Sequence, residues 1–352
     1  MEYSKLVETY QELDQTQATL EKTDILAELF EESGEDLSYV VLLALGRIYP
    51  EWREPEIGVS SQTMVDVIQQ ATGRSEEEIE EVWKEEGDLG FAAEEMVKNK
   101  TQQKLMAREL TVESVMERLR KVAEMDKEGL SQSVNMDKKK KEIADLISNA
   151  EPVEARYITR TVLNHLRLGI GEGTVRDALD EAFFDGEHSE DIQRAYDFTN
   201  DFSRVAEACQ KGLEEVNSLD IELFRPIKSM LAKKVDTIED GFDKVGRPAA
   251  IDTKFDGMRA QIHVKDGEVK VFTRRLEDVT EQFPDVVNAV EENVKSNNCI
   301  LDTEIVGYDP EDGSTIPFQK LSKRIKRKYD IRKLSSEIPV EVRPFDLIYD
   351  EE

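Results

Sequence analysis

The 352-residue chain carries 77 Asp and Glu against 47 Lys and Arg, a formal charge of −30, and 39% of its residues are hydrophobic. This composition is too apolar for a wholly disordered chain, and the length favours two or three domains. No stretch of about 18 apolar residues occurs, and the N-terminus lacks the features of a secretory signal. Two cysteines cannot hold a zinc cluster alone, and they disfavour a disulfide framework. We therefore expect a cytoplasmic multidomain protein with no membrane contact.

Residues 1–218 are predicted to form an all-α domain. Apolar residues recur at helical spacing in residues 20–32, and a second apolar helix from residue 37 is expected to end at Pro50. Further helices are predicted at 62–71, 76–86, 112–123, 139–148, 154–168 and 174–184. Residues 191–215 fit one long helix or two.

Strand patterns begin after this region. Short β-type runs occupy residues 249–255, 259–265, 268–274, 299–308 and 340–350, and a helix is predicted at 283–295. Asp266-Gly267 is a typical hairpin tip between two of these runs. Residues 219–352 are thus predicted to be an α+β domain with an antiparallel sheet. We expect this domain to be incomplete, because the chain stops directly after an apolar strand.

The segment Asp252-Thr-Lys-Phe-Asp-Gly-Met-Arg is the strongest chemical signal. A lysine at the end of a β-type run, followed by a turn and Arg259, becomes a nucleophile if it lies in a pocket where cationic neighbours lower its pKa. Arg259 and Arg274 could hold phosphate or ribose oxygens. The alternative is a surface hairpin whose lysine is merely solvated.

Downstream motifs strengthen the functional interpretation. They follow Lys254-x-Asp-Gly-x-Arg in the order Phe272-Thr-Arg-Arg, Leu301-Asp-Thr-Glu and Pro344-Phe-Asp-Leu-Ile-Tyr. This series resembles covalent nucleotidyltransferases, and most closely the ATP-dependent DNA ligases of the archaeal and eukaryotic type. Residues 156–179 resemble the helical DNA-binding domain of that family, and residues 224–232 resemble the opening of its adenylation domain. The resemblance covers nearly the whole chain.

The resemblance implies a role for each matching residue. Lys254 would attack the α-phosphorus of ATP and hold AMP. Asp252 matches the acceptor for the adenine amino group, where relatives usually have Glu, and Phe345 matches the aromatic that stacks on the purine. Arg259 and Arg274 match contacts to ribose and phosphate.

Glu304 matches the carboxylate that engages the ribose and supports a Mg²⁺-assisted step. ATP and Mg²⁺ are the implied cofactors, and nicked duplex DNA is the implied substrate. His165, His188 and His263 are too scattered for a metal triad, and we interpret them as structural.

DNA contact is predicted for residues 156–176. Arg156, Arg160 and Arg167 are expected on one broad helical face. The following segment would bring backbone amides close to phosphates, with Thr174 capping the next helix. The candidate residues there are Gly171, Gly173, Thr174 and Arg176. The alternative is a glycine turn that joins two core helices.

The charge is unevenly distributed along the chain. Acid is dense in residues 75–88, whereas residues 320–333 hold eight Lys and Arg and one Asp. An acidic surface with a local basic stripe fits a DNA-binding protein of a salt-adapted archaeon, because salt screens repulsion between remote charges. The alternative is an ordinary acidic protein with one solvated basic helix.

The favoured function is therefore nick sealing in DNA replication, repair, recombination and cell division. An RNA ligase or capping-type nucleotidyltransferase is the first alternative, although the helical domain disfavours it. A catalytically incomplete nick-binding fragment is the second, because later motifs and an OB-fold domain are missing after residue 352. We expect the chain as printed not to complete ligation by itself. A sliding clamp as a further partner is left open.

Overall fold

The computed structural model describes all residues except 54, 101–108, 129–130, 230–231, 326–330 and 352. Contacts divide the chain into two compact units, Met1–Asp220 and Ile221–Glu352. Each unit has its own hydrophobic core, which draws on residues 3–219 in the first and 258–321 in the second. Within the described residues, no helix combines the length and apolarity needed to cross a membrane.

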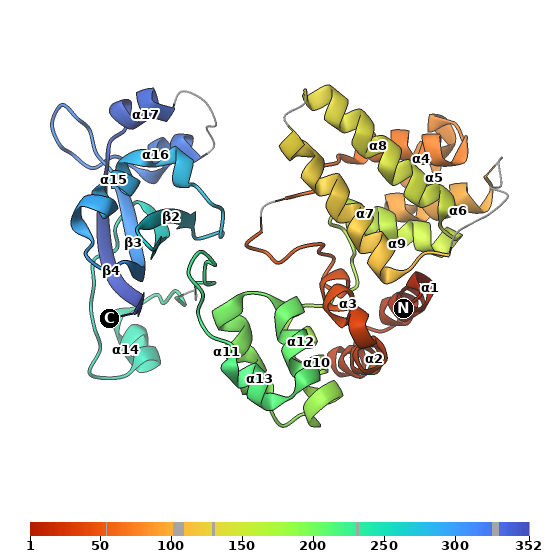
Figure 1. The fold of residues 1–352 in the computed structure, drawn as a ribbon, viewed down its shortest axis with the longest axis horizontal. Helices are drawn as coiled ribbons and strands as arrows, with labels where there is room; N and C mark the ends of the chain where they lie inside the picture. The colour runs from red at the N-terminus through yellow and green to blue at the C-terminus, as the bar shows by residue number, and fades with distance from the viewer. Residues whose placement is uncertain (54, 101–108, 129–130, 230–231, 326–330, 352) are drawn as a thin grey trace. The chain divides into compact units, whose positions relative to one another are not determined.

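The first unit is built from helices (Figure 1). They are α1 Tyr3–Gln15, α2 Thr19–Glu32, α3 Leu37–Ala44, α4 Ser61–Thr72, α5 Glu76–Glu86, α6 Leu89–Lys98, α7 Val112–Glu124, α8 Gln132–Asn149, α9 Pro152–Val162, α10 Glu172–Phe184, α11 Ser189–Thr199, α12 Phe202–Lys211 and α13 Leu213–Ser218. The predicted helical character of this region is confirmed.

Local capping explains where several helices begin and end. Ser75 and Glu78 form a capping box at the start of α5, and Gly87 ends that helix in the left-handed region at φ 66°. The predicted bounds of this helix, 76–86, are therefore correct. By contrast, α3 ends at Ala44, well before Pro50, because Gly46 already adopts a left-handed φ of 71°.

Three other helical predictions are wrong in their bounds, and the first is α8, which begins at Gln132 and not at residue 139. Helix α9 ends at Val162 and not at residue 168, because Asn164, Arg167 and Gly169 all have positive φ. Helix α10 begins at Glu172 with Gly171 as its N-cap, so Thr174 lies inside the first turn and caps nothing.

Residues 191–215 form three helices, where we expected one or two. Asn200 ends α11 at a φ of 50°, and Asp201 then caps α12 by accepting from the N–H groups of Ser203 and Arg204. Gly212, at a φ of 110°, separates α12 from α13.

A four-stranded antiparallel sheet with order β2-β1-β3-β4 organises the second unit (Figure 1). The strands are β1 Met258–Lys265, β2 Glu268–Thr273, β3 Asn298–Gly307 and β4 Val340–Asp350. The helices are α14 Ile238–Val245, α15 Pro284–Asn293, α16 Phe318–Ile325 and α17 Ile331–Glu337. The α+β prediction with antiparallel pairing is confirmed.

The predicted hairpin at Asp266-Gly267 is present, whereas the strand predicted at residues 249–255 is not. Lys265 pairs with Glu268 across Asp266 and Gly267, whose φ values of 50° and 82° fit a two-residue type I′ turn. Residues 249–255, however, form no strand. In the described sheet, of order β2-β1-β3-β4, this segment pairs with none of the four strands.

The sheet has one apolar and one polar face. Met258, Ala260, Ile262 and Val264 alternate along β1 into the core, where α15 and α16 pack against the strands. The residues between them point to the opposite face, and they are Arg259, Gln261 and His263. This polar face carries the candidate site.

Candidate functional site

Three charged residues lie in register across the polar face. Arg259 of β1 pairs with Glu304 of β3, which pairs in turn with Arg343 of β4. Directly opposite residues of neighbouring strands point to the same face, so these side chains form one row. A carboxylate flanked by two guanidinium groups provides both acceptors and donors for a polar ligand.

Arg259 is held in one orientation by Asp302. Its Nε and a terminal nitrogen donate to the two carboxylate oxygens at 3.0 and 2.6 Å, and this bidentate pairing raises the pKa of Arg259. The guanidinium carbon also lies 5.5 Å from the centre of the Phe345 ring. Phe345 is 44% exposed and lies beside a bulge in the β3–β4 pairing, so its ring is open to a ligand.

Glu304 approaches the segment that carries Lys254. The N–H of Gly257 donates to Glu304 at 3.1 Å, and a Cβ at Gly257 would lie 2.5 Å from the carbonyl oxygen of Ile305. This close approach requires glycine. Burial raises the pKa of Glu304, while the Gly257 N–H and the nearby charges of Lys254 and Arg259 act in the opposite direction.

The Lys254 segment itself is exposed. Residues 249–257 have no regular secondary structure, and Asp252 and Lys254 are both exposed. Phe255 is partly buried, with the guanidinium carbon of Arg343 lying 4.7 Å from the centre of its ring. The segment is therefore fixed to the sheet just after the lysine.

The structure brings together only some of the predicted nucleotide-site residues. Arg259, Glu304 and Phe345 lie on one face with Lys254 near Glu304. Asp252 accepts from the adjacent N–H of Thr253, and Arg274 is exposed in the turn after β2. Neither Asp252 nor Arg274 takes part in the contacts given above for Arg259, Glu304 and Phe345.

Asp302, Phe255 and Arg343 contact this site but were not among the predicted residues. The spacing of Asp302 two residues before Glu304 could have identified it, since alternate strand residues share a face. Nothing in the sequence indicates that Arg343 stacks on Phe255, because the two are 88 positions apart.

The other half of the polar face is covered by residues 221–227. Gln261 accepts from the N–H of Ile227 and donates to its carbonyl, and Nδ1 of His263 accepts from the N–H of Phe224 at 3.0 Å. Gln261 and His263 are 5% and 0% exposed as a result. Burial lowers the pKa of His263 to about 3. His263 is thus a structural, neutral residue in this fold.

Two of the predicted DNA-binding arginines lie inside the first unit. Arg160 is 5% exposed and donates to Asp88 and Asp14 at 3.0 Å each. Arg156 pairs with Glu94 and lies 4.0 Å from the centre of the Phe91 ring. Since α9 ends at Val162, Arg167 is not on a helical face with them.

The remaining predicted residues are more accessible. Arg167 is 54% exposed in its side chain, with Asp88 at 3.7 Å. A Cβ at Gly171 or Gly173 would meet nothing within 4 Å, so the backbone at the start of α10 is open on that side. Arg176 pairs with Asp177 and Gln193, and Thr174 is buried.

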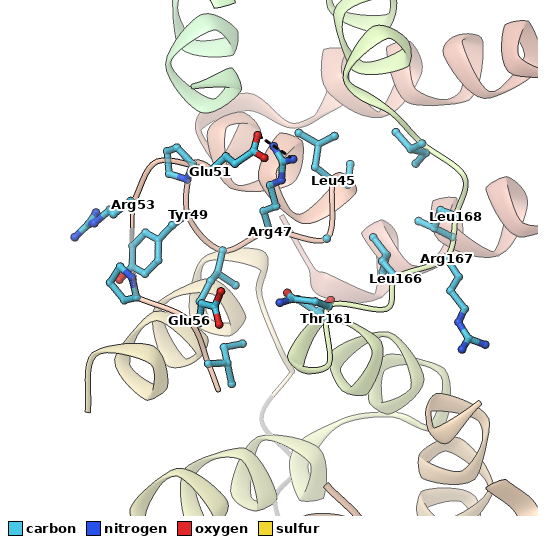
Figure 2. Close-up of a pocket in the computed structure, with 18 of the residues that line it drawn as sticks. Leu45, Arg47, Tyr49, Glu51, Arg53, Glu56, Thr161, Leu166, Arg167 and Leu168 are labelled. Atoms are coloured by element: carbon cyan, nitrogen blue, oxygen red, sulfur yellow. Dashed lines mark ion pairs between the residues drawn. The ribbon is translucent and has the colours of Figure 1, made fainter. Parts of the chain in front are cut away.

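A cavity of about 580 Å³ lies between residues 44–53 and 55–57 on one side and residues 161–170 on the other (Figure 2). Arg47 on its wall pairs with Glu51 and Glu172, whereas Arg167 points away from the cavity. The loops around it are held by cations that donate to backbone carbonyls. Lys22 donates to Leu168 at 2.5 Å, Arg120 to Ile48 and Lys139 to Ile57, both at 2.8 Å. Of these bonds, the one from Lys22 to Leu168 anchors the loop that carries Arg167.

The basic segment 320–333 is only partly described. Arg324 is 1% exposed and forms a bidentate pair with Asp285, so it contributes to the interior. Residues 326–330 lie outside the described part of the chain. Lys320, Lys323, Arg332 and Lys333 are the described cations of this segment that remain for a surface role.

Comparisons with known proteins agree with the fold. The family profile described as "DNA ligase N terminus" matches residues 2–180, and the one described as "ATP dependent DNA ligase domain" matches residues 229–352. The chain is 39% identical over 350 residues to a DNA ligase of Nanoarchaeum equitans, covering 99% of the chain and 60% of that relative. A DNA ligase of Methanothermobacter thermautotrophicus is 40% identical over 350 residues, with 99% and 61% covered.

A solved structure titled "Pmar-Lig_Pre." has the same fold, with a TM-score of 0.52 at 16% identity, over 97% of this chain and 56% of that one. A helical unit matched by a DNA ligase N-terminal profile, followed by a sheet-containing unit matched by an ATP-dependent ligase domain, defines the class of ATP-dependent ligases. The chain belongs to the ATP-dependent DNA ligase family. It spans about 60% of the length of the curated relatives that it matches.

Proposed function

We propose that the protein seals nicks in duplex DNA at the expense of ATP. Nζ of Lys254 attacks the α-phosphorus, a P–N bond forms, and pyrophosphate leaves. AMP then passes to the 5′-phosphate of the nick, and attack by the 3′-hydroxyl forms the phosphodiester and releases AMP. The observation that supports this best is Lys254 beside Glu304, on a face where Asp302 orients Arg259.

Each neighbouring residue has a proposed role. Arg259, already held by Asp302, binds a phosphate or ribose oxygen without losing side-chain freedom on binding. Phe345 stacks on the purine, because its aromatic ring is 44% exposed and lies close to Arg259. Asp252 and Arg274 are exposed, and we propose that they join the site when nucleotide binds.

The carboxylates of the site fit Mg²⁺ only as a metal shared with the nucleotide. Within the described residues, no group of three or more His, Cys, Asp and Glu side chains is arranged to hold a metal. Mg²⁺ is commonly bound by one or two carboxylates together with substrate phosphates and waters. Glu304 would be one such ligand, and the metal would neutralise phosphate charge.

We propose that the first unit binds the duplex through Arg167, Arg176 and the open backbone at Gly171 and Gly173. Sequence-independent binding suits contacts to the phosphate backbone. Arg156 and Arg160 support this surface from within, because both pair with carboxylates of the same unit. A salt-adapted archaeal origin and roles in replication, repair and recombination remain parts of this proposal.

The covalent step gives a direct test of this function. Incubation with ATP labelled at the α-phosphate, followed by a denaturing gel, should label the protein, and Lys254→Ala should abolish the label. Lys295→Ala is the matched control, because Lys295 is exposed beyond α15. Label retained in Lys254→Ala would contradict the proposal. Discharge of the label by nicked DNA, compared with nicked RNA, would then distinguish a DNA ligase from an RNA ligase.

A further inference from the structure

Arg343 contacts Phe255, the residue that follows Lys254 in the chain. Its guanidinium carbon lies 4.7 Å from the centre of the Phe255 ring, within the range of a cation–π contact. Phe255 follows Lys254 directly in the chain. The contact therefore acts one residue away from the proposed nucleophile.

The need for such a contact follows from the local structure. Residues 249–256 belong to no helix or strand, so no ladder of hydrogen bonds fixes Lys254. On its C-terminal side, Gly257 is attached to Glu304 by a hydrogen bond and by close packing on Ile305. Phe255, two residues earlier, lies outside any helix or strand, and its ring contacts Arg343.

The sheet fixes Arg343 in a position to hold that ring. Arg343 pairs in register with Glu304 on β4, and a terminal nitrogen donates to Glu341 at 3.0 Å. Its side chain is 32% exposed, so the stacked contact is partly shielded from water. Glu304 thus lies between Gly257 on one side and the strand that carries Arg343 on the other.

We propose that Arg343 is a positioning residue for adenylation, which acts by clamping Phe255 and so holding Lys254 over Glu304. This inference rests on the proposed function of Lys254. Arg343 needs no contact with the nucleotide in this role. It therefore governs the rate of the covalent step and leaves nucleotide affinity unchanged.

The test is single-turnover labelling of the complete protein with ATP labelled at the α-phosphate, over a range of ATP concentrations. Arg343→Met and Phe255→Leu should each lower the maximal rate by about threefold to thirtyfold, the effect expected of one cation–π contact. The half-saturating ATP concentration should change by less than about twofold. Phe255→Tyr, which keeps the ring, should behave as the unmodified protein does.

The double variant Arg343→Met with Phe255→Leu should be no slower than the slower single variant, because both remove the same contact. Lys295→Met controls for the loss of one positive charge, and thermal unfolding of each variant checks that the fold is retained. Three results would overturn the clamp. The first is an unchanged rate in Arg343→Met, and the second is a loss in the double variant equal to the product of the two single losses. The third is a raised half-saturating ATP concentration at an unchanged maximal rate. Label that persists in Lys254→Ala would instead overturn the proposed function itself.

Discussion

At the scale of single residues, the arginines of the first unit divide into buried and exposed groups. Arg160 is 5% exposed between Asp14 and Asp88, whereas the side chain of Arg167 is 54% exposed. The same residue type thus has two different physical roles within eight positions. Buried charges are stabilising only with their partners, and exposed ones are available to phosphates.

Substitution of these two arginines should therefore have opposite effects. Arg160→Met should destabilise the first unit by about 3–5 kcal/mol, because two carboxylates lose their partner in the interior. Arg167→Met should change stability by less than about 0.5 kcal/mol and lower the salt slope of DNA binding by about 0.9. Trp52 and Trp83, both in the first unit, report unfolding by fluorescence. A DNA salt slope that falls with Arg160→Met and not with Arg167→Met would refute this assignment.

At the scale of elements, the segment 221–227 completes the sheet's polar face by docking on β1. Two side chains of one strand, Gln261 and His263, satisfy backbone groups of this segment. His263 must be neutral to accept from the N–H of Phe224. The docking of the segment is therefore linked to pH.

Acid should weaken this docking. The pKa of His263 is about 3 in the folded protein and about 6.5 in an unfolded chain, so between these two pH values the unfolded state binds the proton and the folded state does not. Stability is complete above pH 6.5 and falls by about 1.4 kcal/mol for each pH unit toward pH 3. His263→Gln removes this dependence.

Hydrogen exchange of the β1 and β2 amides at pH 7.5 and pH 5 measures the effect. Between these two values, the unmodified protein should lose about 2 kcal/mol more protection than His263→Gln. Comparison of both proteins at the same pH cancels the intrinsic pH dependence of exchange. An equal loss in the two proteins would show that His263 does not couple the segment to pH.

At the scale of the whole molecule, the acid is concentrated in one unit. Residues 1–220 hold 50 Asp and Glu against 25 Lys and Arg, a formal charge of −25, and residues 221–352 hold 27 against 22, or −5. The unit to which we assign DNA binding is therefore the more acidic one. Like charges on one compact unit destabilise it at low ionic strength.

Salt should accordingly stabilise the first unit more than the second. Raising NaCl from 0.1 to 1 M shortens the Debye length from about 10 to about 3 Å, which screens this repulsion. We expect the unfolding temperature reported by Trp52 and Trp83 to rise. Protection of the β1 and β2 amides serves as the internal control, because the second unit has little net charge. An unfolding temperature that stays constant or falls would argue against salt adaptation.

Local signals in the sequence were sufficient where neighbouring residues determine the conformation. The capping box of Ser75 and Glu78 and the left-handed Gly87 predict α5 correctly, and Asp266-Gly267 predicts the β1–β2 hairpin. The order of the motifs around Lys254 likewise predicted the family. The helix α5 and the hairpin depend on residues close together in the chain, and the family assignment depends on the order of the motifs.

Tertiary structure decided the features that depend on distant partners. Arg160 is buried because Asp14 and Asp88 reach it from 146 and 72 positions away, and Arg259 is oriented by Asp302 from 43 positions away. Residues 249–255 have strand composition, yet they pair with none of the four described strands. Pairing, burial and charge compensation need two segments in contact, so helical and strand periodicity alone could not reveal them.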